Sequence, residues 1–349
     1  MVERNLAKVE VASSSLVSRS NFKEPLKHML QGLFCVSDFI FMTLPNTPTP
    51  TAEDLFRLTD DGAGGWLQTT KRRLKFRLRY HLCRDYLEEI RNFFLSHDLA
   101  FLTQSELPLM LRPMRSYLWR GLAPEGRAQA QLAFLNWLLQ RYSAESVKEF
   151  YAQNGYELFS QTYPEGVIRV ILSPGRALGR EGELEMHLQF NDVSVMKSAF
   201  SVLPARMVGM AVEGFVMVIG NMQGQRSANQ EIKFVTQKME RTRPQNILMT
   251  ALQGLASGWQ LVGMVGVSDA AHVYSGYRSL SQRVGQSYDS LWQELGSTGA
   301  LSKTHWNLPI QWVARSEQDV PSNKRSQLRR KNEIRQKIFD EVARNSAGL

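Results

Sequence analysis

Two apolar runs constrain the fold of this chain more than any other feature. The run FVMVI at residues 215–219 leads into GNMQG at 220–224, and a second run at 261–267 ends in SDAAHVY at 268–274. Between them, apolar residues at helical spacing follow Pro244, which predicts a helix that begins near the proline. A strand, a glycine turn, a helix and a strand build anion sites in many α/β proteins. We therefore expect the functional site in this part of the chain.

The spacing of apolar residues changes near residue 150. Apolar residues at 54–150 recur at spacings of three and four, which indicates amphipathic helices. Short, partly alternating runs follow at 157–163, 167–172 and 183–190, separated by turns that contain proline and glycine, as is typical of antiparallel strands. These patterns predict an α/β (α+β) fold, in which a helical amino-terminal region precedes a mixed-sheet domain.

The predicted divisions are residues 1–28, a helical region at 29–150, an α/β domain at 151–315 and a basic helix at 316–349. Residues 9–22 resemble the peptide read in frame from the end of a transfer-RNA gene, so we expect residues 1–28 to be disordered or to precede a true start near Met29. The apolar stretch at 29–44 is shorter than a bilayer span and carries Asp38, which favours a buried or interfacial helix.

The formal net charge of +9 points to an anionic partner, such as nucleic acid, an acidic lipid surface or a phosphorylated small molecule. Basic residues gather at 71–84 and again at 324–337. Each cluster is either a solvated helix face or a surface that binds an anionic membrane or phosphate. We do not expect a nucleic acid partner, because the sequence contains no RNA-recognition motif, zinc finger or recognition helix.

Cysteine and histidine usage argues against a metal site or a disulfide framework. The two cysteines, Cys35 and Cys83, form no CxxC pair, and the six histidines show no metal-ligand spacing. We therefore expect no metal and a reducing compartment. The amino terminus lacks the continuous apolar core of a secretory signal, which predicts a cytoplasmic protein, with attachment to the inner membrane surface as an option.

Several short motifs together resemble the VirK/YbjX family of Gram-negative bacteria. They are REGEL at 180–184, GNMQG at 220–224, TRP at 242–244, GVS at 266–268, HVY at 272–274, and the basic pairs at 324–325 and 329–330. The resemblance implies a cytosolic protein linked to virulence, envelope integrity and resistance to antimicrobial peptides, with no established reaction. Residues 239–242 depart from the family, because MERT stands where a more glycine-containing approach is expected.

The predicted order of elements also resembles that of the GCN5-related acyltransferases. In that fold a glycine turn at a helix amino terminus binds the pyrophosphate of coenzyme A. The resemblance implies that Gly220, Gln223, Gly224 and Arg243 bind a coenzyme A thioester, here a co-substrate rather than a firmly bound cofactor. The match is imperfect, because residues 225–242 separate the glycines from the helix after Arg243.

If acyl transfer is the chemistry, an acceptor must lose a proton and the departing thiolate gains one. Glu183 and His272 are the candidate bases, and the resemblance suggests Tyr274 as the acid. Each has a structural alternative: a surface carboxylate at a strand end, a packing histidine, and a core tyrosine with a satisfied hydroxyl. Arg243 suits two roles equally well: it binds an anionic ligand, or it forms a salt bridge that fixes its loop.

Two functions from different classes remain open. In the first, the protein transfers an acyl group from a thioester donor to a small-molecule or lipid acceptor at the membrane face. In the alternative, it is a non-catalytic stress or chaperone-like protein that binds anionic partners or the membrane surface.

Overall fold

The computed structural model describes residues 51–59, 66–153, 155–176, 178–275 and 287–347. The expectations for residues 1–50, including the start near Met29 and the helix at 29–44, lie outside the described residues. The chain divides into two compact units, Met1–Arg77 and Leu78–Leu349.

Helices α2 (Ala52–Thr59) and α3 (Trp66–Ser96) come first. The capping side chain of Thr51 donates to Asp54 at 2.6 Å, which fixes the start of α2. Phe56 of α2 packs edge-on against Phe76 of α3, with ring centroids 5.6 Å apart. The alternating sequence at 71–84 therefore forms a helix, as the apolar residues after it predict, and not a strand.

The second unit begins with helices, as predicted. After α3 come α4 (Leu102–Ser105), α5 (Leu107–Met110), η2 (Arg112–Met114), α6 (Pro124–Arg141) and α7 (Ala144–Ala152). Pro124 occupies the first turn of α6, where its missing amide proton costs nothing. The hydroxyl of Ser143 accepts from the amide of Ser146 and caps α7.

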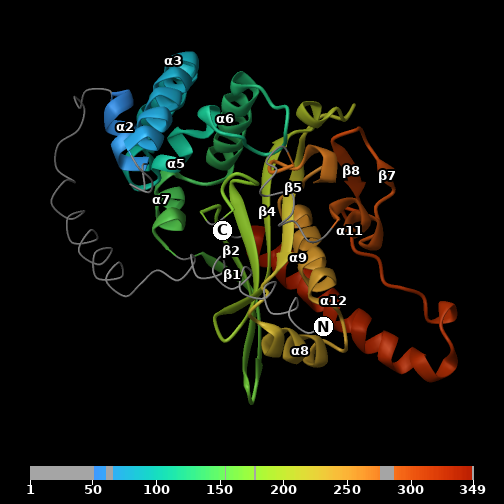
Figure 1. The fold of residues 1–349 in the computed structure, drawn as a ribbon. Helices are drawn as coiled ribbons and strands as arrows, with labels where there is room; N and C mark the ends of the chain where they lie inside the picture. The colour runs from blue at the N-terminus through green and yellow to red at the C-terminus, as the bar shows by residue number, and fades with distance from the viewer. Residues whose placement is uncertain (1–50, 60–65, 154, 177, 276–286, 348–349) are drawn as a thin grey trace, which may run out of the picture. The chain divides into compact units, whose positions relative to one another are not determined.

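Within the described residues, eight strands form one mixed sheet (Figure 1). They are β1 (Tyr156–Tyr163), β2 (Gly166–Pro174), β3 (Leu184–Phe190), β4 (Val193–Pro204), β5 (Phe215–Gly224), β6 (Gly263–Val267), β7 (Gly299–Ala300) and β8 (His305–Leu308), in the spatial order β1-β2-β3-β4-β5-β6-β8-β7. Neighbours are antiparallel except β5 and β6, which are parallel. The expected mixed α/β fold is thus confirmed.

Helices α8 (Asn229–Lys238) and α9 (Pro244–Gly258) connect β5 to β6, and α12 (Ser322–Ala347) ends the described chain. Helices α9 and α12 lie side by side against the sheet (Figure 1). Their close approach depends on Gly254, where an added Cβ would lie 2.6 Å from the carbonyl oxygen of Phe339. Only a residue without a side chain allows the two backbones to come so near.

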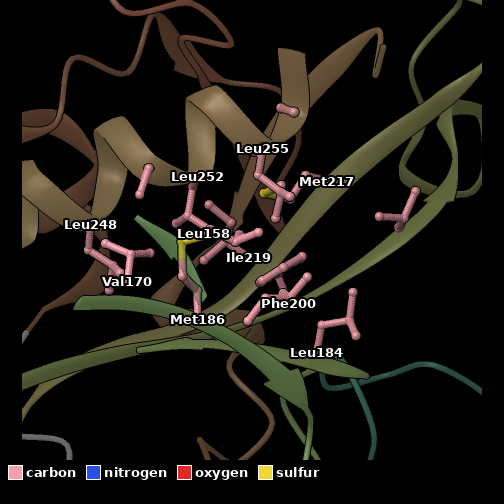
Figure 2. Close-up of a cluster of buried hydrophobic side chains, with 14 of the residues drawn as sticks. Leu158, Val170, Leu184, Met186, Phe200, Met217, Ile219, Leu248, Leu252 and Leu255 are labelled. Atoms are coloured by element: carbon pink, nitrogen blue, oxygen red, sulfur yellow. The ribbon is translucent and has the colours of Figure 1, made fainter. Parts of the chain in front are cut away.

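The main core lies between the sheet and α9 (Figure 2). Leu248, Leu252 and Leu255 project from α9 toward the strands, where they meet side chains such as Phe200 and Ile219. All five side chains are almost fully buried. Because side chains alternate along a strand, the residues beside Ile219 face the other side of the sheet. There Val218 joins a second apolar cluster with Tyr117 and Val265.

Candidate functional site

Strand β6 stops pairing with β5 halfway along β5. Parallel pairing extends from Val216 opposite Gly263 to Ile219 opposite Gly266, whereas β5 continues to Gly224. The register of β5 against β4 shifts at the same place, so that Gly220 is an extra, bulged residue. The carboxyl ends of parallel strands are where open α/β sheets commonly bind ligands.

Four buried polar side chains gather where the two strands separate: Glu181, Asn221, His272 and Tyr288, which we call the Glu181 cluster. Asn221 Nδ2 donates to Glu181 Oε1 and to the Tyr288 hydroxyl, both at 2.9 Å. The Tyr288 ring stacks on the His272 ring, with centroids 4.8 Å apart. Glu181, Asn221 and His272 are each 3% exposed or less.

His272 and Glu181 form a carboxylate–imidazole pair. His272 Nε2 lies 2.9 Å from Glu181 Oε1, although its N–H bond does not point at that oxygen. On the other side of the ring, Nδ1 accepts a long 3.4 Å bond from the Tyr274 amide, which assigns the proton to Nε2. The pair thus leaves Nδ1 as the basic nitrogen.

The Glu181 cluster is incompletely satisfied. In the described part of the chain, Asn221 Oδ1 and His272 Nε2 are buried without an aligned hydrogen-bond partner. A buried polar atom without a partner costs about 1–3 kcal/mol. Since buried polar groups are usually paired, such a cost favours a functional role over a purely structural one.

A second buried group surrounds Glu183 and comprises Arg112, Tyr117, Glu183 and Ser201, which we call the Glu183 cluster. Arg112 donates to Glu183 Oε2 at 3.1 Å, and the Tyr117 hydroxyl donates to Glu183 Oε1. The amide of Glu183 donates to Ser201 Oγ at 3.0 Å. Every member is at most 5% exposed, so this carboxylate is neutralised inside the protein rather than presented to solvent.

Burial and charge set the protonation of the tyrosines. Burial, and then the nearby charge of Glu183, raises the pKa of Tyr117 well above its ordinary value. Burial also raises the pKa of Tyr288, with Glu181 adding to the effect. For Arg112 burial works to lower the pKa, but the charge of Glu183, the nearby tyrosines and the hydrogen bond to Glu183 together outweigh it, and the pKa is raised. Both tyrosines therefore remain protonated hydrogen-bond donors at neutral pH.

A strained segment connects the two clusters. Leu118 has φ = +58°, a left-handed conformation that is rare for a side chain of this size. Its amide donates to the Arg180 carbonyl at 2.8 Å, and Trp119 forms an isolated bridge with His272. Strain of about 1–3 kcal/mol persists only where the surroundings enforce it, and it often marks functional sites.

The predicted site residues are only partly brought together. His272 belongs to the Glu181 cluster, and Glu183 lies two residues from Glu181. Gly220 touches the same segment, because an added Cβ would lie 2.0 Å from the Glu181 carbonyl oxygen. Tyr274 is half-buried, with its ring centroid 5.7 Å from that of His272. Glu183 is buried and ion-paired, so it is not a carboxylate on the surface.

The expected glycine turn is wrong as local structure. Residues 220–224 continue strand β5, with Gln223 opposite Lys197 and Gly224 opposite Met196 of β4. The chain leaves the sheet only after Gly224, and α8 begins at Asn229 without a capping side chain. The ladder with β4 holds these residues extended, which overrides the turn preference of glycine.

Arg243 stands apart from both clusters. It precedes α9, and its guanidinium lies 3.6 Å from Glu294 in an exposed ion pair. Such exposed pairs contribute little to stability. The geometry is that of the salt bridge considered as the alternative for this residue.

Sequence reasoning missed six members of the two clusters, including Ser201 of β4. Glu181 and Asn221 lay inside the motifs at 180–184 and 220–224, but nothing marked them as buried. Arg112 and Tyr117 precede Glu183 by more than sixty residues. Tyr288 begins α11 (Tyr288–Glu294), and its place depends on the Asp269 carboxylate, which accepts from its amide at 2.7 Å.

The two basic clusters differ in the structure. Arg329 of α12 forms two 3.0 Å hydrogen bonds with Glu317, and Arg330 lies 3.1 Å from Glu240. Arg73 and Arg77 of α3 likewise pair with Glu53, but the basic residues of α3 also surround a row of exposed leucines. Residues with described positions include no group of His, Cys, Asp and Glu that could hold a metal ion. Nor is any helix in the described ranges both long and apolar enough to cross a membrane.

Comparisons with known proteins agree with one another. A 131-residue region is 27% identical to the uncharacterized protein YbjX of Escherichia coli and covers 36% of this chain and 39% of that protein. A 121-residue region is 30% identical to an uncharacterized protein of Haemophilus influenzae and covers 34% and 40%. The matches thus span about two-fifths of these curated relatives, and no solved structure matches. Residues 65–346 match the model of a family described as a protein of unknown function, DUF535, and the chain therefore belongs to the DUF535 family.

Proposed function

We propose that the protein transfers an acyl group from a thioester donor to an amine or hydroxyl acceptor. One observation carries this proposal: the buried His272–Glu181 pair lies where β5 and β6 separate, with polar atoms left without aligned partners. The order of elements resembles that of the GCN5-related acyltransferases. The bulge at Gly220 and the parallel pairing that stops at Ile219 place the pair at the carboxyl ends of parallel strands, where open α/β sheets commonly bind ligands.

The proposed chemistry assigns one proton to each step. His272 Nδ1 accepts the proton of the acceptor amine or hydroxyl as its nitrogen or oxygen attacks the thioester carbonyl. Glu181 stabilises the imidazolium that forms, in the way that a carboxylate supports the histidine of a catalytic triad. The carbon–sulfur bond breaks, and the departing thiolate takes a proton from the Tyr274 hydroxyl, which His272 later restores.

The donor phosphates require a different place from the one first expected. Residues 220–224 belong to a strand, so they do not form the start of a helix. The first helix amino terminus after β5 is that of α8. A helix amino terminus favours anions through its unpaired N–H groups. Gly224, exposed at the end of β5, then flanks the phosphates rather than cradling them.

The family resemblance suggests the biological setting. A role in envelope integrity and resistance to antimicrobial peptides fits an acceptor drawn from the cell envelope. Acylation of such an acceptor changes its charge or its apolar area.

Calorimetric titration with coenzyme A, acetyl-coenzyme A and a long-chain acyl-coenzyme A tests the donor site first. We expect saturable binding that Gly224→Asp weakens at least tenfold by charge repulsion. Gly224→Ala is the matched control, since the nearest atom to its added Cβ is 3.8 Å away. No binding to any donor would overturn the proposal.

Turnover tests the base. We expect Glu181→Gln to lower thiol release from the bound donor by a factor of about 10²–10⁴, because the base His272 then loses the carboxylate that stabilises its imidazolium. Glu185→Gln is the control, because Glu185 is also buried and lies 3.2 Å from His187, outside the Glu181 cluster. Equal loss in both variants would point to folding, and full activity of Glu181→Gln would exclude the pair as catalytic.

A further inference from the structure

Helix α3 carries most of the exposed large hydrophobic side chains of the described residues. Of the ten such side chains, six belong to this helix: Trp66, Leu67, Leu74, Leu78, Leu82 and Leu95. The four leucines at 67, 74, 78 and 82 are seven, four and four residues apart. Residues at these spacings share one face of a continuous helix. They form what we call the leucine row, and each member is at least 59% exposed.

Positive charge borders the leucine row. Residues 71–84 contain seven lysines and arginines and no acid. Lys71 and Lys75 are exposed and occupy helical positions between the leucines, three or four residues from their neighbours in the row. The leucine row ends at Leu82, and the next acidic residue along the chain is Asp85. The opposite face of α3 is apolar and buried, with Cys83, Leu87, Ile90 and Phe94.

We propose that the leucine row of α3 binds the surface of an anionic phospholipid bilayer. Such a surface offers apolar acyl chains beside negative headgroups, which matches a narrow row of leucines bordered by lysines. Trp66, 78% exposed at the start of α3, suits the headgroup region. Helix α12 lacks this combination, because its described residues include no exposed large hydrophobic side chain beside the basic ones.

Sedimentation with sucrose-loaded vesicles tests the proposal on the full chain. At about 0.1 M salt we expect binding to vesicles of phosphatidylcholine with one-quarter phosphatidylglycerol, and much weaker binding to phosphatidylcholine alone. Lys71→Gln with Lys75→Gln should weaken binding about 30-fold, since each basic residue near an anionic surface contributes about fivefold. Leu74→Ser with Leu78→Ser should weaken it at least tenfold.

The control variant is Lys324→Gln with Arg325→Gln, which removes the same charge from the exposed start of α12. It should retain most of the binding. Because all substituted residues are exposed, circular dichroism should show unchanged folding. Equal binding to both vesicle types, or equal loss in the α3 and α12 variants, would overturn the proposal. So would a wild-type dimer that the leucine variants convert to a monomer, because the row would then be an interface between two copies.

Discussion

At the scale of single residues, the ion pair of Arg112 and Glu183 connects the helices before the sheet with the start of β3. Both side chains are at most 6% exposed, and they lie 3.1 Å apart. Removing one member of a buried pair leaves an uncompensated charge, which costs about 3–5 kcal/mol. We expect Arg112→Met to lower the free energy of unfolding in urea by about this amount.

The double variant Arg112→Met with Glu183→Met separates charge from packing. It should recover much of the lost stability, since an apolar pair can replace a buried ion pair. Arg243→Met is the exposed control, because its 3.6 Å pair with Glu294 should contribute less than about 1 kcal/mol. A double variant as unstable as the single one would show that the site tolerates only the polar pair.

His305 should make stability depend on pH. Burial lowers its pKa to about 4, against about 6.5 in the unfolded chain. Between these values the unfolded chain holds a proton that the folded chain does not, so stability falls as the pH falls from about 6.5 to 4. The loss should reach about 3 kcal/mol.

Denaturation in urea at several pH values measures this dependence. His305→Gln should flatten the curve between pH 6.5 and 4, whereas His81→Gln, on the exposed surface of α3, should leave it unchanged. An unchanged curve for His305→Gln would place the acid sensitivity elsewhere.

Individual site residues were predictable where a strand end marked them. His272 follows β6 closely, and Glu183 directly precedes β3, so their positions in the sequence made them candidates. Arg112, Tyr117 and Tyr288 reach the same region through tertiary packing. No periodicity in one sequence encodes such a contact between residues more than sixty positions apart.

At the scale of elements, the contact of α9 with α12 predicts that replacing Gly254 by alanine destabilises the protein, although helix propensity alone predicts the opposite. Alanine in a helix interior is favoured over glycine by about 1 kcal/mol. At Gly254, however, the added Cβ would lie 2.6 Å from the Phe339 carbonyl oxygen and 3.2 Å from Val342 Cβ. Gly254→Ala should therefore lower the free energy of unfolding by about 1–3 kcal/mol.

Gly224→Ala serves as the matched glycine control. Its added Cβ would make only an ordinary van der Waals contact, 3.8 Å from the Val195 carbonyl oxygen, and the change should stay within about 0.5 kcal/mol. Thermal unfolding of both variants compares the two positions directly. A stabilised Gly254→Ala would mean that α12 moves away from α9 at little cost.

Elements with a clear period were predicted well, and those without one were not. The helix from Pro244 and the strands near 157–163 and 167–172 are confirmed. Strand β4 was not predicted, because it is buried on both faces and shows no alternation of apolar and polar residues. The turn at 220–224 was wrong because pairing with β4, a tertiary interaction, decides that segment.

At the scale of the second unit, Leu78–Leu349, one core joins elements far apart in sequence. Leu138 of α6, Met186 of β3, Leu252 of α9 and Ile338 of α12 belong to a single cluster of buried side chains. The change from helices to strands near residue 150 is therefore not a change of core. Elements that share one core are expected to unfold together.

We therefore expect Leu138→Ala and Ile338→Ala to destabilise the same cooperative transition, each by about 2–5 kcal/mol. Far-UV and near-UV circular dichroism should report coincident midpoints in both variants, although the substitutions lie two hundred residues apart. Leu95→Ala, at a side chain 46% exposed, should change stability by less than about 0.5 kcal/mol. Two separate transitions, with only one shifted in each variant, would instead show that α6 and α12 stabilise independent cores.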